Sequence, residues 1–77
     1  MKLVKELTYI ELQELINKNV RFISDCVLFK DFDIKCKIIS IDNYQNTEHI
    51  FNCKILNNGK IIKIGSNMSN LQFEILN

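Results

Sequence analysis

The pair Asn58-Gly59 constrains the fold more than any other feature of this 77-residue sequence. Apolar and polar residues alternate on both sides of the pair, and Asn-Gly in such a setting is the strongest short-range signal for a β-hairpin. A two-residue type I′ turn needs a positive φ angle at both central positions, which asparagine and glycine tolerate. With these two residues as the loop, Cys53 pairs with Ile64. The predicted buried face of the hairpin consists of Phe51, Cys53, Ile55, Ile62 and Ile64.

Thr8 and Glu11 predict the start of a helix. They have the spacing of a capping box, in which each residue binds the backbone amide of the other. An apolar stripe at helical spacing follows the box, and Asn17 can take the left-handed conformation that ends a helix. The stripe consists of Tyr9, Leu12, Leu15 and Ile16. We therefore expect a helix over residues 8–17, preceded by an arm, residues 1–7, that either frays or forms a short extra strand.

From residue 20 onward the pattern is typical of β-strands. Residues 34–42 are the longest candidate and have apolar residues on both faces, so this strand is expected to bend or bulge between two packing surfaces. Residues 71–76 alternate strictly, which predicts that Leu71, Phe73 and Ile75 point inward. A single domain of class α+β, mostly β, follows. Its one helix precedes about five short strands, residues 20–76, and a small antiparallel barrel would bury their faces and remove their edges.

One segment resembles a known family. The run Phe29-Lys30-Asp31-Phe32, followed by residues 36–42, is similar to the KOW motif of bacterial transcription elongation factors and ribosomal proteins. That motif has a Phe-x-x-Phe element, a glycine and a strand ending in Ile-Asp. Here Cys36 replaces the glycine, and Ile34-Lys35 looks like an insertion. The resemblance implies an SH3-like barrel over residues 20–76 and contacts with nucleic acid or the ribosome. An Sm-like barrel, also a helix followed by five strands, is the alternative and would imply an RNA-binding ring.

Composition and charge narrow the function. Ten Lys and Arg residues against nine Asp and Glu give a net charge of +1, which provides no overall attraction to phosphate backbones or anionic membranes. No apolar run approaches the roughly 18 residues of a membrane span, and no charged segment leads into the apolar core of a signal peptide. These observations predict a soluble, cytoplasmic protein.

The cysteines predict neither disulfides nor a metal site. The three of them form no Cys-x-x-Cys pair, and their odd number in a short chain favours reduced, buried thiols. His49 is the lone histidine, so a zinc site and a cysteine–histidine nucleophile both lack partners. With no phosphate-binding glycine loop either, we expect a protein that is not an enzyme and needs no cofactor or metal.

The sequence favours a small protein-interaction module. Aromatic and acidic residues gather in the predicted loop over residues 25–33 and in the turn around Tyr44, and loops on a rigid scaffold are free to carry recognition. The candidate partner-binding residues are Phe29, Asp31, Phe32, Asp33 and Tyr44. The acidic surplus would repel phosphates and suit a basic protein surface, such as that of a nucleic-acid-binding effector. As a monomer or small homo-oligomer, such a module would suit a phage or mobile-element inhibitor of a host defence complex, of the anti-CRISPR kind.

Nucleic-acid binding is the alternative function. The cations that would carry it lie near two phenylalanines, and single strands bind where cations and stacking rings combine. These cations are Arg21, Lys30, Lys35 and Lys37, beside Phe29 and Phe32. Sequestration of a small ligand between two such barrels is a further possibility.

Overall fold

The computed structural model describes residues 2–25, 32–43, 48–68 and 70–76. In chain order the elements are β1 (Lys2–Leu3), the 3₁₀ turn η1 (Val4–Glu6), α1 (Tyr9–Glu14), β2 (Asn19–Ser24), β3 (Phe32–Asn43), β4 (His49–Ile55), β5 (Ile61–Gly65) and β6 (Gln72–Ile75).

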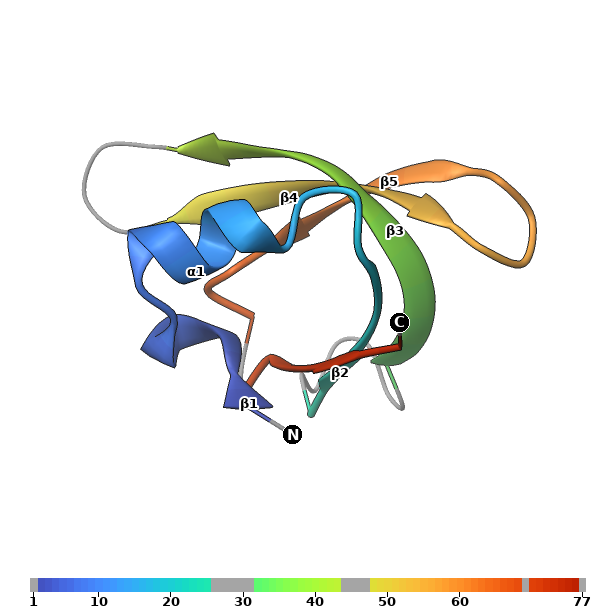
Figure 1. Ribbon diagram of the computed structural model, residues 1–77. Coiled ribbons are helices and arrows are strands. Elements are labelled where there is room, and N and C mark those ends of the chain that lie inside the picture. The colour runs from blue at the N-terminus through green and yellow to red at the C-terminus, as the bar shows by residue number, and fades with distance from the viewer. Residues whose placement is uncertain (1, 26–31, 44–47, 69, 77) are drawn as a thin grey trace.

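The six strands form one open antiparallel sheet in the order β1-β6-β2-β3-β4-β5. The prediction of a closed five-stranded barrel, whether SH3-like or Sm-like, is therefore wrong. The arm adds a sixth strand, because β1 pairs with β6 through Lys2 opposite Phe73, while β5 pairs with β4 alone. In the described part of the chain no pairing joins β1 to β5, so the sheet keeps two edges. It nevertheless curves strongly around its core, with α1 lying across its concave side (Figure 1).

The capping box at Thr8 is confirmed. The Glu11 backbone amide donates to the Thr8 hydroxyl at 3.2 Å, and the Thr8 amide donates to the Glu11 carboxylate at 3.1 Å. The helix ends at Glu14, earlier than expected, and a tight turn leads to Asn17, whose positive φ of 69° fits its predicted role. Leu12 and Leu15 are buried as the apolar stripe predicts, whereas Tyr9 is 58% exposed.

Strand β3 is longer than expected and contains the anticipated irregularity. Its pairing with β4 shifts between Ile38 and Ser40. Before the shift Ile38 is buried, and after it Ile41 packs against the core, although an unbroken alternation would put these two residues on opposite faces. The bulge thus lets one strand cover two parts of the core.

The Asn-Gly hairpin has the predicted faces but a different register. Cys53 pairs with Ile62 rather than Ile64, because the loop holds four residues instead of two. Gly59 has a φ of 74°, but Asn58 is not among the described residues with positive φ, so the turn is not type I′. The Gly59 amide donates to the Ile55 carbonyl at 2.8 Å, and the Lys60 amide donates to the Asn58 side chain at 2.9 Å. A two-residue shift keeps each side chain on its face.

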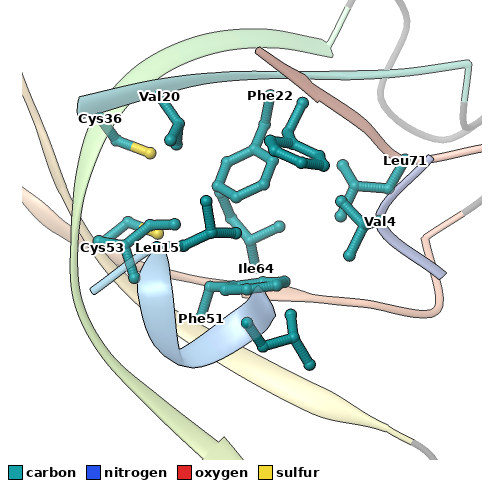
Figure 2. Close-up of a cluster of buried hydrophobic side chains, with 12 residues drawn as sticks. Val4, Leu15, Val20, Phe22, Cys36, Phe51, Cys53, Ile64 and Leu71 are labelled. Atoms are coloured by element: carbon teal, nitrogen blue, oxygen red, sulfur yellow. The ribbon is translucent and has the colours of Figure 1, made fainter. Parts of the chain in front are cut away.

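The core fills the concave side of the sheet (Figure 2). Phe22 and Phe51 are fully buried, and their ring centroids lie 5.3 Å apart at a tilt of 43°, within the range favourable for aromatic pairs. The arm also contributes, since the Val4 amide donates to the Leu71 carbonyl at 2.8 Å and the Val4 side chain is buried. Phe73 and Leu71 point inward as predicted, but Ile75 is 51% exposed, contrary to expectation.

Candidate binding surface

The predicted recognition loop is partly a strand. Phe32 and Asp33 begin β3, and Phe32 is half-buried against the core rather than displayed to solvent. Phe29, Asp31 and Tyr44, the other predicted contact residues, lie outside the described residues, as does Lys30 of the nucleic-acid alternative. Their role in binding stays a prediction.

Asp33 and Arg21, predicted to serve different functions, form an ion pair. Two hydrogen bonds join the guanidinium to the carboxylate, Nε to Oδ1 at 2.8 Å and Nη2 to Oδ2 at 2.6 Å. These bonds lower the pKa of Asp33 and raise that of Arg21. Arg21 also lies directly opposite Glu74 of β6. The charges of both predicted residues are therefore already balanced within the protein.

The convex, solvent-facing side of β3, β4 and β5 carries a group of lysines that we call the lysine face. Its residues occupy adjacent positions in the sheet register. Lys37 lies opposite Lys54, which lies opposite Ile61. Beside this row, the Leu56 amide donates to the Lys35 carbonyl at 3.0 Å, and Lys63 lies opposite Asn52. The lysine face comprises Lys35, Lys37, Lys54, Leu56, Ile61 and Lys63.

Among the described residues, no carboxylate lies within ion-pair distance of a lysine of the lysine face, and the apolar side chains of the face are exposed. Its four lysines are exposed, and the ion pairs among the described residues are Lys2–Glu11 and Arg21–Asp33. Leu56 is 48% exposed and Ile61 is 60% exposed. Exposed aliphatic side chains can be buried against a partner, and cations beside them favour a partner with complementary negative charge.

Acidic groups lie at the border of the lysine face. Asp42 is bound by the Asn52 amide at 3.1 Å, and that same amide donates to Ser40 at 3.0 Å. Glu48 sits near Gly65, where an added β-carbon would come within 3.2 Å of its carboxylate. Neither carboxylate is within ion-pair distance of a lysine in the described part of the chain, so the centre of the face remains cationic.

The sequence singles out two of the four lysines of this face. Lys35 and Lys37 are the candidates for nucleic-acid binding, whereas Lys54 and Lys63 lie outside the predicted buried face of the hairpin and receive no role from the sequence. Lysine alternates with apolar residues on both sides of Asn58-Gly59, which is the sequence signal that Lys54 and Lys63 share one exposed side of the hairpin. That Lys37 belongs to the same surface follows only from the register of β3 against β4, which places Lys37 opposite Lys54.

A groove of about 750 Å³ lies between α1 and β6, on a different part of the surface. Apolar side chains of Leu7, Leu15, Phe73 and Ile75 line it. At its rim Lys2 pairs with Glu11 at 3.6 Å. The groove offers room for an apolar group.

Cys36 and Cys53 lie together in the core (Figure 2). Both are free thiols with no exposed area. Their mutual hydrogen bond and burial raise the pKa of Cys53 above its ordinary value, which keeps this thiol protonated and unreactive. Among the described residues no group of three His, Cys, Asp or Glu side chains is arranged to hold a metal ion.

The comparisons with known proteins provide no family for the chain. No protein-family model matches it, and neither curated proteins nor solved structures gave a match. The resemblance to the KOW motif therefore stays a prediction. A search of the described residues for a helix long and apolar enough to cross a membrane found none.

Proposed function

We propose that this protein is a non-enzymatic interaction module that binds a protein partner through its lysine face. The observation that carries the proposal is the direct apposition of Lys37 and Lys54. Like charges directly opposite each other in a sheet destabilise it, so the pair weakens the fold. Carboxylates of a bound partner would offset the repulsion between Lys37 and Lys54, so the pair would favour the binding of an acidic surface.

A protein surface suits the lysine face better than a nucleic acid does. Single strands are held by rings that stack on bases, and the lysine face contains aliphatic side chains instead. Of the cations predicted to contact phosphates, Arg21 is already bound to Asp33. Nucleic-acid binding through the four lysines is the second candidate, because their charge alone would attract phosphates.

The partner favoured by the lysine face has an acidic surface. The prediction of a basic partner depends on the acidic surplus of the loop over residues 25–33. Within that loop Asp33 is paired with Arg21 and Asp31 lies outside the described residues, so a basic partner stays a prediction. A role as a phage or mobile-element inhibitor agrees with a small binding module, but it depends on composition and size, with no individual residue behind it.

Affinity purification from the natural host cell tests the proposal. The tagged parent chain is purified with and without nuclease, beside the variant Lys37→Glu with Lys54→Glu. The matched control is Lys5→Glu with Lys18→Glu, which makes the same change of charge away from the lysine face. We expect a protein band that survives nuclease, persists with the control and is lost with the lysine-face variant. Nucleic acid as the only co-purifying species would support the second candidate instead.

A further inference from the structure

Strand β5 is an edge of the sheet with backbone groups open to a partner. It is the last strand in the sheet order and pairs with β4 alone. The Ile55 amide donates to the Lys60 carbonyl at 2.8 Å, and the Ser66 amide donates to the His49 carbonyl at 2.9 Å. These two bonds define which residues of β5 face β4.

Hydrogen-bonded and non-bonded pairs alternate along an antiparallel ladder, and residues of non-bonded pairs point their amide and carbonyl away from the neighbouring strand. The two bonds above therefore place Ile62 and Ile64 in bonded pairs with β4. Ile61, Lys63 and Gly65 direct their backbone groups outward. The Gly65 carbonyl accepts from the Met68 amide at 3.2 Å, whereas within the described residues no hydrogen bond uses the outward groups of Ile61 or Lys63.

The side chains along this edge have a definite pattern. Ile61 and Lys63 belong to the lysine face, two positions apart on the convex side of the sheet. A lysine on an edge strand discourages unwanted pairing. Protection alone does not explain the edge, because Ile61 beside this lysine is 60% exposed.

We propose that β5 binds an extended segment of a partner protein, which adds a seventh strand to the sheet. This inference rests on the proposed function and names the chemistry of the partner. A residue opposite Lys63 would carry a carboxylate, and a residue opposite Ile61, two positions further along the added strand, would be apolar. The backbone of the segment bonds the outward groups of Ile61 and Lys63, and its carboxylate reduces the repulsion within the lysine face.

A second copy of the chain fits this edge less well. Two β5 strands paired antiparallel about Lys63 would put the two Lys63 side chains directly opposite each other, and the rest of each lysine face would adjoin the other. The cations along the edge select a partner with negative charge.

Selection from a displayed library of random 12-residue peptides tests the inference. The parent chain is the target, and the selected peptides are then measured against Lys63→Thr and Lys63→Pro, each checked for folding by circular dichroism. Threonine removes the charge but keeps the outward amide. Proline removes both the charge and the amide hydrogen. It breaks no hydrogen bond to β4, because the Lys63 amide points away from β4. We expect selected peptides with a carboxylate two positions from an apolar residue, and binding about tenfold weaker to Lys63→Pro than to Lys63→Thr, from the loss of one backbone hydrogen bond.

Amide hydrogen exchange on the parent chain provides a test that needs no variant. The Ile61 and Lys63 amides should exchange rapidly in the free protein and become protected when a selected peptide binds, while the Ile62 amide should change little.

The inference is overturned by failure to select any peptide, by selected peptides without carboxylates, or by equal binding to the proline and threonine variants. It is also overturned if sedimentation shows a dimer of the parent that Lys63→Pro dissociates, because a second copy would then occupy the edge. The proposed function would survive these results if the host protein band still depended on Lys37 and Lys54. The proposed function itself is contradicted if nucleic acid is the only species that co-purifies with the chain.

Discussion

Lys37 and Lys54 lie directly opposite each other on the convex side of β3 and β4, with no carboxylate of the described residues within ion-pair distance of either. Replacing Lys37 with Glu should convert this repulsion into attraction and raise the free energy of unfolding by about 0.5 kcal/mol. Urea unfolding measures the change, and Lys18→Glu, at an exposed position outside the lysine face, is the control. If Lys37→Glu is more stable than the parent and also loses the partner, the lysine pair serves binding at the expense of stability. Equal stability of the two chains would show that the repulsion is screened.

Gly59 tests the turn. Its φ of 74° is unfavourable for a residue with a branched side chain, so Gly59→Val should lower the free energy of unfolding by about 1 to 3 kcal/mol. An added β-carbon would meet only the end of the Lys54 side chain, at 3.7 Å, so the expected loss comes from backbone strain. Asn57→Val, at a neighbouring exposed position, is the control. An unchanged melting temperature for Gly59→Val would contradict the turn geometry.

Thr8 tests the helix cap. Thr8→Ala removes the hydroxyl that accepts from the Glu11 amide and should lower the free energy of unfolding by about 1 kcal/mol. Thr8→Ser keeps the acceptor and should remain close to the parent in the same thermal or urea denaturation. Equal losses for the alanine and serine variants would mean that the methyl group of Thr8, rather than its cap, matters.

The ion pair of Arg21 and Asp33 should make the stability of the fold depend on pH in the acidic range. Hydrogen bonds from Arg21 lower the pKa of Asp33 in the folded protein below its unfolded value. The pair therefore stabilises the fold at pH values above the unfolded pKa, and this stabilisation is lost as the pH falls through the folded pKa. Asp33→Asn should show a smaller decrease in urea midpoint on acidification than the parent. In Arg21→Gln, the pKa of Asp33 measured by carboxyl-carbon NMR should return toward its ordinary value, and an unchanged pKa would exclude the ion pair.

The two core cysteines predict slow thiol chemistry. Cys36 and Cys53 have no exposed area, so a thiol reagent can reach them only when the protein opens. With Cys26 replaced by serine, the two remaining thiols should react far more slowly in native buffer than in denaturant. Rapid native labelling of both would show that β3 and β4 separate readily.

Local signals in the sequence predicted local structure well. The capping box at Thr8, the left-handed Asn17 and the buried face of the hairpin all depend on residues a few positions apart, and the structure confirms each. The predicted register of the hairpin was wrong, because Asn-Gly is compatible both with a two-residue loop and with a longer loop in which only Gly59 has a positive φ. The two loops differ by an even number of residues, so the faces were right although the pairs were not.

Relationships between distant segments were beyond the sequence. Nothing in residues 1–7 shows that Lys2 pairs with Phe73, and this pairing turns the arm into a sixth strand. The expected barrel assumed that edges would be removed, whereas the structure keeps β5 as an edge. The lysine face was not predicted as one surface for the same reason. Lys37 and Lys54 meet only through the register of two strands, and Asp33 was assigned to a loop when it begins β3 and binds Arg21.

The position of β2 between β3 and β6 has a consequence for how the chain folds. Strands β2 to β5 follow one another in sequence and can pair as successive hairpins. Strand β6 pairs with β2, from which β3, β4 and β5 separate it in the sequence. Before β6 pairs with β2, Val20 lacks its neighbour Ile75 and Phe22 lacks its neighbour Phe73. Docking of β6 is therefore expected to be a late and slow event, because contacts between distant segments carry the largest entropic cost. A growing chain on the ribosome should complete its core only after residues 72–75 have emerged.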